Sequence, residues 1–301
     1  MNQAFLTYPE WQPTADTLHM LLQMIGKIKL ERNNKRPEWA HARQYLTLDG
    51  LTTGIIPGNH SPFEIAVNFR EHHITVRNTE GYSIHIPLRD GVSIARYYEQ
   101  LHHALKYIGS PTTINVRAQE FYDPIDFDQD EKHHSYDAAA VTLFQNNLLF
   151  AYHALNKFMS PFRGKVDFPA YYFGTMDLSC IVYSGEAAPF HSNGCISYPA
   201  FDERNCEFGF WPGDPKALEP SFYVMPYPFI SSIEENGNML RPDKAVFKPE
   251  KKEFFLTLKD ALSYDNPEEK IVEFFTSSLA IVQQLKKWDN WEWITHPLSY
   301  K

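Results

Sequence analysis

The sequence predicts an α+β fold in which two antiparallel sheets pack with helices. Four segments place apolar residues at steps of three and four, which is the period of a buried helix face. Short β-rich stretches lie between these segments, and turn residues separate them. Consecutive short strands joined by tight turns pair as antiparallel neighbours, so a mainly parallel sheet is not expected.

The four helices are expected near residues 14–30, 93–108, 137–160 and 266–285. The first carries one apolar face made of Leu18, Leu21, Leu22, Ile25 and Ile28. Ser93 and Asp137 precede the second and third helices as N-caps, and Pro161 ends the third. The fourth opens with Asn266 and Pro267 followed by two acidic residues, as a helix N-terminus prefers.

Ten strands are expected between the helices. In the first half they form a meander over residues 44–48, 51–56, 63–69, 72–77 and 82–87, whose last hairpin turns at residues 78–81. In the second half they cover residues 171–173, 178–183, 206–211, 221–227 and 253–258. Residues 186–205 and 229–252 are expected to be long loops, because Pro and Gly interrupt both.

The chain is therefore expected to have two halves, residues 1–120 and 121–301, which pack as one body. Each half consists of a helix, several strands and a second helix. A local pattern recurs at constant offset: Tyr45, Leu51–Thr52 and Gly58 in the first half, and Tyr172, Leu178–Ser179 and Gly185 in the second. A diverged internal duplication would explain this recurrence. Coincidence between two α+β segments is the alternative, because short aromatic–aliphatic matches arise easily.

Charge and cysteine usage restrict the partners and the compartment. The chain has 37 acidic and 28 basic residues and a formal net charge of -9, which argues against nucleic acid and against an anionic membrane surface. No run is long enough for a membrane span, and the N-terminus does not resemble a signal peptide. Three unpaired-looking cysteines fit a reducing compartment, so a cytoplasmic location is expected. A small-molecule ligand is the remaining partner class, and the oligomeric state is unknown.

No familiar catalytic motif is present. The chain lacks a phosphate loop, a dinucleotide fingerprint, zinc-finger cysteine spacing and a nucleophile elbow. The motifs therefore assign no reaction and no cofactor, and whether the protein is an enzyme stays open.

Residues 122–137 form the richest polar stretch and suggest a divalent metal. The candidate ligands are Asp126, Asp128, Asp130, His133 and Asp137. A calcium loop would need glycine where Glu131 stands, but imidazole and carboxylate also suit a transition metal. The alternative is a loop whose carboxylates accept hydrogen bonds and whose last residue, Asp137, caps a helix.

The first helix also carries a polar face. His19, Gln23 and Lys27 are spaced at i, i+4 and i+8, so they share one side of the helix. Either they line a binding site, or they form the solvated stripe of an amphipathic helix.

Several ordered motifs resemble an uncharacterised bacterial family, the domain of unknown function 5996. The similar stretches run in order along the chain: residues 11–27; Trp39, His41, residues 51–53 and 63–65; Phe127, Asp128, Asp130, His133, Tyr136 and Asp137; residues 164–165, 173–174, 177–178, 184–185 and 210–213. The resemblance implies no activity. One departure stands upstream of Trp211, where the family tends to carry a His-Glu pair and this chain has Glu203–Arg204.

The resemblance also directs attention to a set of polar and aromatic positions that would line one pocket between the halves. They are His19, Gln23, Lys27, Trp39, His41, Glu64, His133, Tyr136, Lys165, Asp177 and Trp211. Among them His19, Lys27, Trp39, Glu64, His133 and Asp177 are expected to converge on a single cavity. An acid, a histidine and a lysine held together can tune one another's pKa for acid–base work, although a lysine and a glutamate can also form a structural ion pair.

Three functions remain open. The first is binding, with or without chemical transformation, of a small polar molecule in that pocket between the halves. The second is a non-catalytic interaction or structural role, and the third is that of a divalent-metal-dependent enzyme. A pocket lined by Trp, His and carboxylates would favour the first, and an exposed apolar patch the second.

Overall fold

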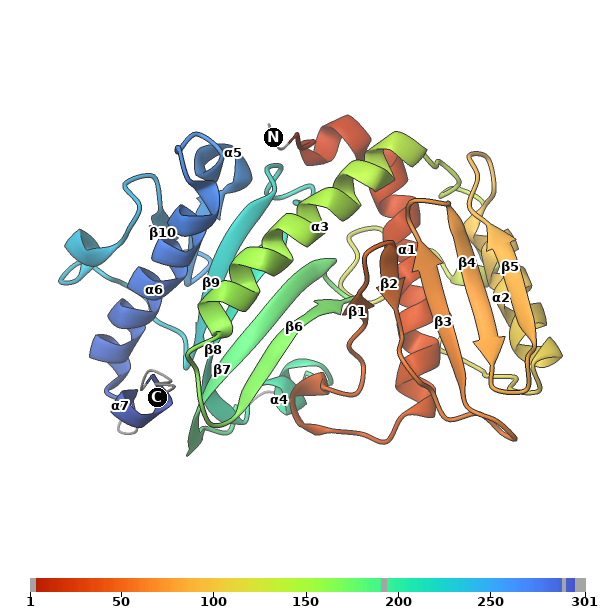
Figure 1. Cartoon of the computed structure of the whole chain (residues 1–301), viewed down its shortest axis with the longest axis horizontal. Coiled ribbons are helices and arrows are strands. Elements are labelled where there is room, and N and C mark those ends of the chain that lie inside the picture. The colour runs from red at the N-terminus through yellow and green to blue at the C-terminus, as the bar shows by residue number, and fades with distance from the viewer. Residues whose placement is uncertain (1–3, 191–193, 289–290, 296–301) are drawn as a thin grey trace, which may run out of the picture. The chain divides into compact units, whose positions relative to one another are not determined.

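The computed structural model describes residues 4–190, 194–288 and 291–295 and has an α+β fold with two antiparallel sheets (Figure 1). Its helices are α1 (Tyr8–Arg32), α2 (Ile94–Tyr107), α3 (Ala138–Met159), α4 (Ser197–Ala200), α5 (Leu258–Ala261), α6 (Pro267–Lys286) and α7 (Trp291–Ile294). Short 3₁₀ turns lie at Pro37–Trp39, Phe127–Gln129 and Gly237–Met239.

The chain divides into two compact units. The unit that we call the N-terminal unit consists of Ala4–Leu149 together with Tyr171–Asp177. The C-terminal unit consists of Phe150–Ala170 and the described residues from Leu178 onward. The short segment Tyr171–Asp177 is thus separated in sequence from the rest of the unit to which it belongs.

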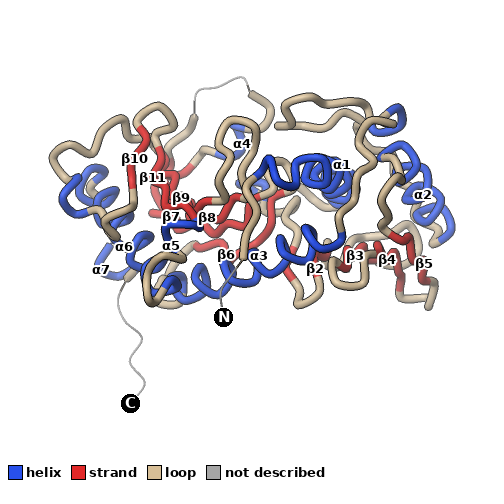
Figure 2. The backbone as a smooth tube through the Cα atoms, turned by 90° about the horizontal axis from the view of Figure 1, so that it is seen from above, coloured by secondary structure: helices blue, strands red, loops and turns tan. Residues whose placement is uncertain are grey.

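The N-terminal unit is built on a five-stranded meander. Its strands β1 (Tyr45–Leu46), β2 (Gly50–Thr52), β3 (Phe63–Asn68), β4 (His73–Asn78) and β5 (Ser83–Pro87) are neighbours in chain order. Residues of β3 alternate, so that Phe63, Ile65 and Val67 are buried while Glu64 faces the other side. Helices α1 and α2 lie on one face of this sheet (Figure 2).

The C-terminal unit carries the six-stranded sheet, in the order β10-β11-β9-β8-β7-β6. Its strands are β6 (Val166–Tyr172), β7 (Asp177–Ala187), β8 (Glu203–Trp211), β9 (Ser221–Tyr227), β10 (Val246–Lys248) and β11 (Glu253–Thr257). Strand β10 lies inside the stretch expected to be loop, because three residues are too few to show a period of two. The duplication is not confirmed: β11 separates β9 from β10, whereas the smaller sheet follows chain order throughout.

Aromatic packing forms the core of the C-terminal unit. Helix α6 packs on β9 and β11. The ring of Phe158, near the end of α3, lies 4.5 Å from that of Phe208 on β8 and 5.2 Å from that of Phe275 on α6. Such ring pairs add to the burial energy of large apolar side chains.

The predicted helix signals are confirmed in the N-terminal unit, with one difference. The Ser93 side chain accepts from Arg96 N, and Asp137 accepts from the backbone of Ala139 and Ala140 at the start of α3. Helix α1 begins six residues earlier than predicted, at Tyr8, because a capping box formed by Thr7 and Glu10 starts it and Pro13 is accommodated near the N-terminus.

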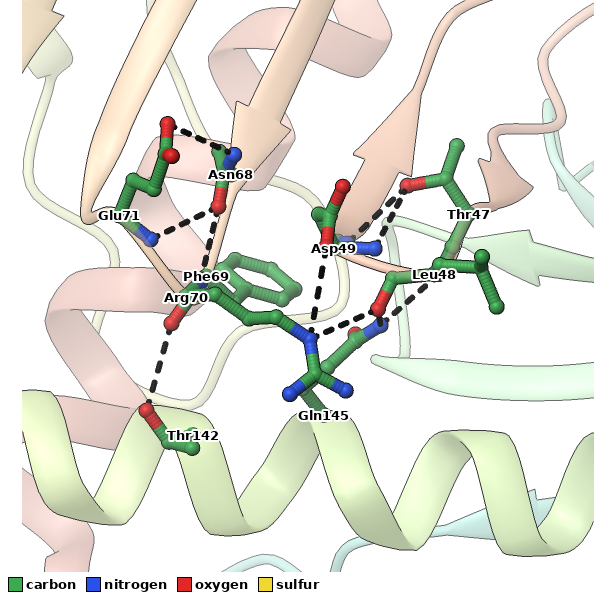
Figure 3. A network of polar contacts seen from close by, with 10 residues as sticks. Thr47, Leu48, Asp49, Asn68, Phe69, Arg70, Glu71, Thr142 and Gln145 are labelled. Atoms are coloured by element: carbon green, nitrogen blue, oxygen red, sulfur yellow. Dashed lines mark hydrogen bonds and ion pairs between the residues drawn. The ribbon is translucent and has the colours of Figure 1, made fainter.

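Polar contacts attach two turns of the meander to α3 (Figure 3). The buried Gln145 side chain donates to the carbonyls of Thr47, at 2.9 Å, and Leu48, at 3.3 Å. One helical turn earlier, Thr142 Oγ1 donates to Phe69 O at 3.4 Å. The first part of α3 is therefore held to the sheet by side-chain bonds to backbone that the strand ladders leave unpaired.

Among the described residues, no helix combines the length and the apolar character needed to cross a membrane.

Candidate functional site

The polar face of α1 is buried. His19, Gln23 and Lys27 are at most 9% exposed, so the solvated-stripe interpretation is wrong. His19 Nε2 lies 3.1 Å from Phe173 O and 2.9 Å from Gly174 O. Carbonyl oxygens only accept, so Nε2 carries the proton and Nδ1 carries a lone pair. Burial lowers the pKa of His19 to about 4, and the ring is neutral at pH 7.

Gln23 holds a second segment against the same face. Its Nε2 donates to Gln119 O at 2.5 Å, and its Oε1 accepts from Gln119 N at 3.2 Å. Gly26, three residues later on the same face, permits the close approach of Phe173, because a Cβ there would lie 2.0 Å from Cδ1 of that ring. Helix α1 thus fixes both the segment that follows Gln119 and the segment around Phe173.

Phe121 connects two histidines. Its ring centroid lies 5.2 Å from that of His19 and 5.5 Å from that of His133, both in edge-to-face geometry. We call His19, Phe121, Asp130 and His133 the imidazole cluster. All four belong to the N-terminal unit.

Asp130 and His133 form a buried pair. Asp130 is 0% exposed and His133 is 5% exposed, and His133 Nδ1 lies 2.7 Å from Asp130 Oδ2. The other carboxylate oxygen accepts from the backbone N–H groups of Lys132 and His133. Because a carboxylate accepts, Nδ1 donates, and the lone pair of neutral His133 is on Nε2. That Nε2 is buried and has no hydrogen-bond partner among the described residues.

A second buried carboxylate adjoins the imidazole cluster. Asp16, three residues before His19 on α1, accepts hydrogen bonds from the hydroxyls of Tyr8 and Tyr122, the latter at 2.7 Å. The Tyr122 ring packs on Phe121 with centroids 4.8 Å apart, and Tyr122 is 49% exposed. Tyr122 therefore links the buried cluster to the surface.

Asp177 lies at the segment that His19 binds. The Thr175 hydroxyl donates to Asp177 Oδ1. The Glu120 carboxylate lies directly against Gly174, where a Cβ would be 2.5 Å from Oε2. Burial raises the pKa of Glu120, and the charge of Asp177 raises it further. The structure thus brings together four of the predicted residues: His19, Gln23, His133 and Asp177.

Glu64 does not join them, and this part of the predicted convergence is wrong. Its carboxylate accepts from Arg77 at 2.6 Å and from Thr52 at 2.5 Å on the face of β3 opposite to the buried residues. Tyr136 also has a separate partner, since its hydroxyl lies 3.0 Å from Nδ1 of His72.

Trp39 and His41 lie in the segment that follows α1, where the His41 carbonyl accepts from the side chain of the C-cap residue Asn33. Their rings stack with centroids 5.6 Å apart, beside the C-terminal end of the helix. Lys27 is buried two turns beyond His19, about 12 Å along the axis at 1.5 Å per residue. Burial lowers the pKa of Lys27.

Two predicted residues belong to the C-terminal unit. Lys165 pairs with Glu203 at 2.8 Å, and its Nζ lies 4.1 Å from the ring centroid of Tyr183. Trp211 ends β8, and Lys251 Nζ lies 4.9 Å from its ring centroid. That these two residues share a site with His19 stays a prediction.

The predicted metal ligands have separate roles. Asp130 pairs with His133, Asp137 caps α3, and Asp126 pairs with Arg117 at 3.3 Å. Asp128 is exposed. Among the described residues, no three His, Cys, Asp or Glu side chains gather in a way that could hold a metal ion.

Sequence reasoning missed Phe121, Tyr8 and Tyr122. Residues 119–123 show no periodicity and meet α1 only through the fold, and Tyr8 precedes the predicted start of the first helix. Asp16 had a detectable signal, since it precedes His19 by three residues and so shares its helix face.

No curated protein sequence and no solved structure is significantly similar to this chain. A family model described as a family of unknown function, DUF5996, matches residues 4–294. That span includes every residue of the imidazole cluster, and with it the expectation drawn from the sequence motifs is confirmed: the chain belongs to the DUF5996 family of unknown function.

Proposed function

We propose that this protein binds a small polar molecule at the imidazole cluster and that His133 Nε2 accepts a hydrogen bond from it. The observation that carries the proposal is the buried Nε2 atom of His133, which has no hydrogen-bond partner among the described residues. A buried polar atom without a partner costs about 1–3 kcal/mol, so such atoms are rare unless they have a use.

The proton positions define the chemistry of the ligand. Asp130 fixes the lone pair on His133 Nε2, and the carbonyls of Phe173 and Gly174 leave the lone pair of His19 on Nδ1. Both rings meet Phe121. The site therefore offers acceptors and an aromatic surface, which suits a ligand with O–H or N–H donors, such as an alcohol, an amine or an amide.

The same pair can also transform the ligand. When His133 Nε2 takes a proton from a bound hydroxyl or amine, a positive imidazolium forms, and the buried Asp130 carboxylate stabilises it. The neutral His19 cannot do this near pH 7, because its pKa is about 4. General-base chemistry is thus assigned to His133, and hydrogen-bond acceptance to His19.

Neither alternative function has comparable support. The carboxylates expected to bind a metal are used by His133, by Arg117 and by the start of α3. An interaction protein would not need a buried carboxylate–imidazole pair with an open nitrogen.

A thermal-shift screen tests the proposal. A library of alcohols, amines and amides is compared on the wild type, on His133→Phe and on the control His103→Phe, which changes an exposed histidine of α2. A ligand that prefers the native state raises its melting temperature. We expect at least one compound to stabilise the wild type and the control but not His133→Phe. A compound that stabilises all three equally, or no stabilising compound at all, would contradict the proposal.

We also propose a cytoplasmic location. None of the three cysteines, which all lie in the described part of the chain, forms a disulfide, and Cys180 and Cys206 are buried. Free thiols are the usual state of cysteine in a reducing compartment.

A further inference from the structure

A second unassigned feature lies at the C-terminal end of α1. Residues 27–43, which we call the basic turn, contain six Lys or Arg residues and two Glu residues, although the whole chain has a net charge of -9. Cations favour a helix C-terminus, where the carbonyl ends of the dipole point outward. That preference explains cations in the last turn of α1, but not why one of them is buried.

Lys29 is the buried cation of that last helical turn. It is 3% exposed, its Nζ donates to Arg43 O, and the Nζ lies 4.3 Å from the ring centroid of Tyr45. Burial lowers the pKa of Lys29 to about 8, and the charges of Arg36 and Arg43 lower it further in the same direction. The charged groups that act on Lys29 are therefore both of its own sign.

His41 adds an unused donor. Its Nδ1 accepts from Arg36 N at 3.1 Å. A backbone N–H can only donate, so Nδ1 is unprotonated and neutral His41 carries its proton on Nε2. This Nε2–H is buried in a side chain that is 5% exposed, and it has no hydrogen-bond partner in the described part of the chain.

The electrostatic surroundings of His41 favour the same state. Burial lowers its pKa, and the nearby cations Lys35, Arg36 and Lys29 oppose a further positive charge on the ring. Its ring is held by stacking on Trp39. The basic turn thus presents a fixed N–H donor among three cations.

We propose that the basic turn is a binding site for a phosphate group, with His41 Nε2–H as hydrogen-bond donor and Lys29, Lys35 and Arg36 as the neutralising cations. An unpaired donor among cations requires an acceptor that carries negative charge. Three cations around one donor exceed the single charge of a carboxylate and suffice to neutralise that of phosphate at neutral pH, about -1.5 to -2. The group is inorganic phosphate or the phosphate of a small ester.

The test compares inorganic phosphate with sodium chloride at equal ionic strength, because any salt screens the charge repulsion of an acidic protein. Binding is followed by thermal shift and by calorimetric titration. His41→Phe keeps a ring against Trp39 and removes the donor. Lys29→Met removes the buried charge, and the control Lys106→Met removes an exposed cation at the end of α2.

We expect phosphate to stabilise the wild type and Lys106→Met more than chloride does. Its affinity for Lys29→Met and for His41→Phe should fall by about tenfold or more, as loss of a charge-assisted hydrogen bond implies. Lys29→Met relieves a buried charge but also removes the donor to Arg43 O, so its melting transition is first measured without phosphate. A cooperative transition there shows that a lost phosphate response is not a folding defect.

Glycerol phosphate, titrated in the same way, distinguishes the two sources: tighter binding than inorganic phosphate identifies an ester, and weaker binding identifies the free anion. A wild type that responds equally to phosphate and chloride, or a Lys29→Met variant that binds phosphate as the wild type does, would overturn the proposal.

Discussion

In three histidines of the N-terminal unit, hydrogen bonds to neighbouring groups determine which ring nitrogen carries the proton. His19 donates from Nε2 to backbone carbonyls, His133 donates from Nδ1 to Asp130, and His41 accepts at Nδ1 from Arg36 N. Each bond leaves the other ring nitrogen with a defined role. His133 and His19 thereby offer a hydrogen-bond acceptor, and His41 offers a donor. Two sites of opposite hydrogen-bonding character thus arise from one residue type.

The low pKa of His19 predicts how stability depends on pH. The folded-state value of about 4 lies below the ordinary value of 6.5, so the unfolded chain binds more protons between these values. The contribution of His19 is complete above pH 6.5 and is lost as the pH falls toward 4. Between pH 7.5 and 4.5 the wild type should lose roughly 2–3 kcal/mol of unfolding free energy through this group.

Urea denaturation at the two pH values measures this loss. His19→Gln places an amide N–H near the position of Nε2 but does not titrate, so the variant should lose that much less stability than the wild type over the same range. Equal losses in the wild type and the variant would show that His19 is not the group responsible.

At the scale of secondary structure elements, α1 is the part that positions the imidazole cluster. Its buried apolar face follows from the periodicity of the sequence, which predicted the helix itself but not its first six residues. The sequence could not predict what the polar face would touch, because Gln119 and Phe173 reach His19 and Gln23 across 96 to 154 residues of chain. Such contacts depend on tertiary packing and leave no local pattern.

Gly26 predicts a specific cost on α1. In an isolated helix, alanine is more favourable than glycine by about 1 kcal/mol. Here the added Cβ of Gly26→Ala would lie 2.0 Å from the ring of Phe173, so we expect the variant to be destabilised by about 1–3 kcal/mol. Chemical denaturation measures the change. Gly237→Ala is the matched control, because a Cβ there meets nothing within 4 Å; if both variants behave alike, the close approach of Phe173 to α1 is not real.

At the scale of the whole molecule, the sequence predicted the α+β class and two antiparallel sheets. It did not predict that Tyr171–Asp177 would join the N-terminal unit. In the structure Tyr171 exchanges two backbone hydrogen bonds with Gln44, at 3.0 and 2.8 Å, and is fully buried. A bridge between residues so far apart in sequence has no signature in hydrophobic period or turn chemistry.

The discontinuous unit makes a prediction about fragments. A fragment of residues 1–149 lacks Tyr171–Asp177 and leaves His19 and the Gln44 backbone without their partners, at about 1–3 kcal/mol for each buried group. A fragment of residues 1–177 keeps them. Urea denaturation followed by circular dichroism should therefore show a higher midpoint for the longer fragment, and equal midpoints would argue against the assignment of this segment.

The most direct test of the proposed site is the tautomer of His133. Long-range ¹H–¹⁵N correlation spectra of the histidine side chains, assigned by the loss of one ring system in His133→Phe, report which nitrogen carries the proton. We predict a neutral ring with a protonated Nδ1 and an unprotonated Nε2 whose resonance moves when a stabilising compound is added. A neutral ring protonated at Nε2, or an Nε2 resonance that no stabilising compound shifts, would contradict the assignment of His133 as the open acceptor of this protein.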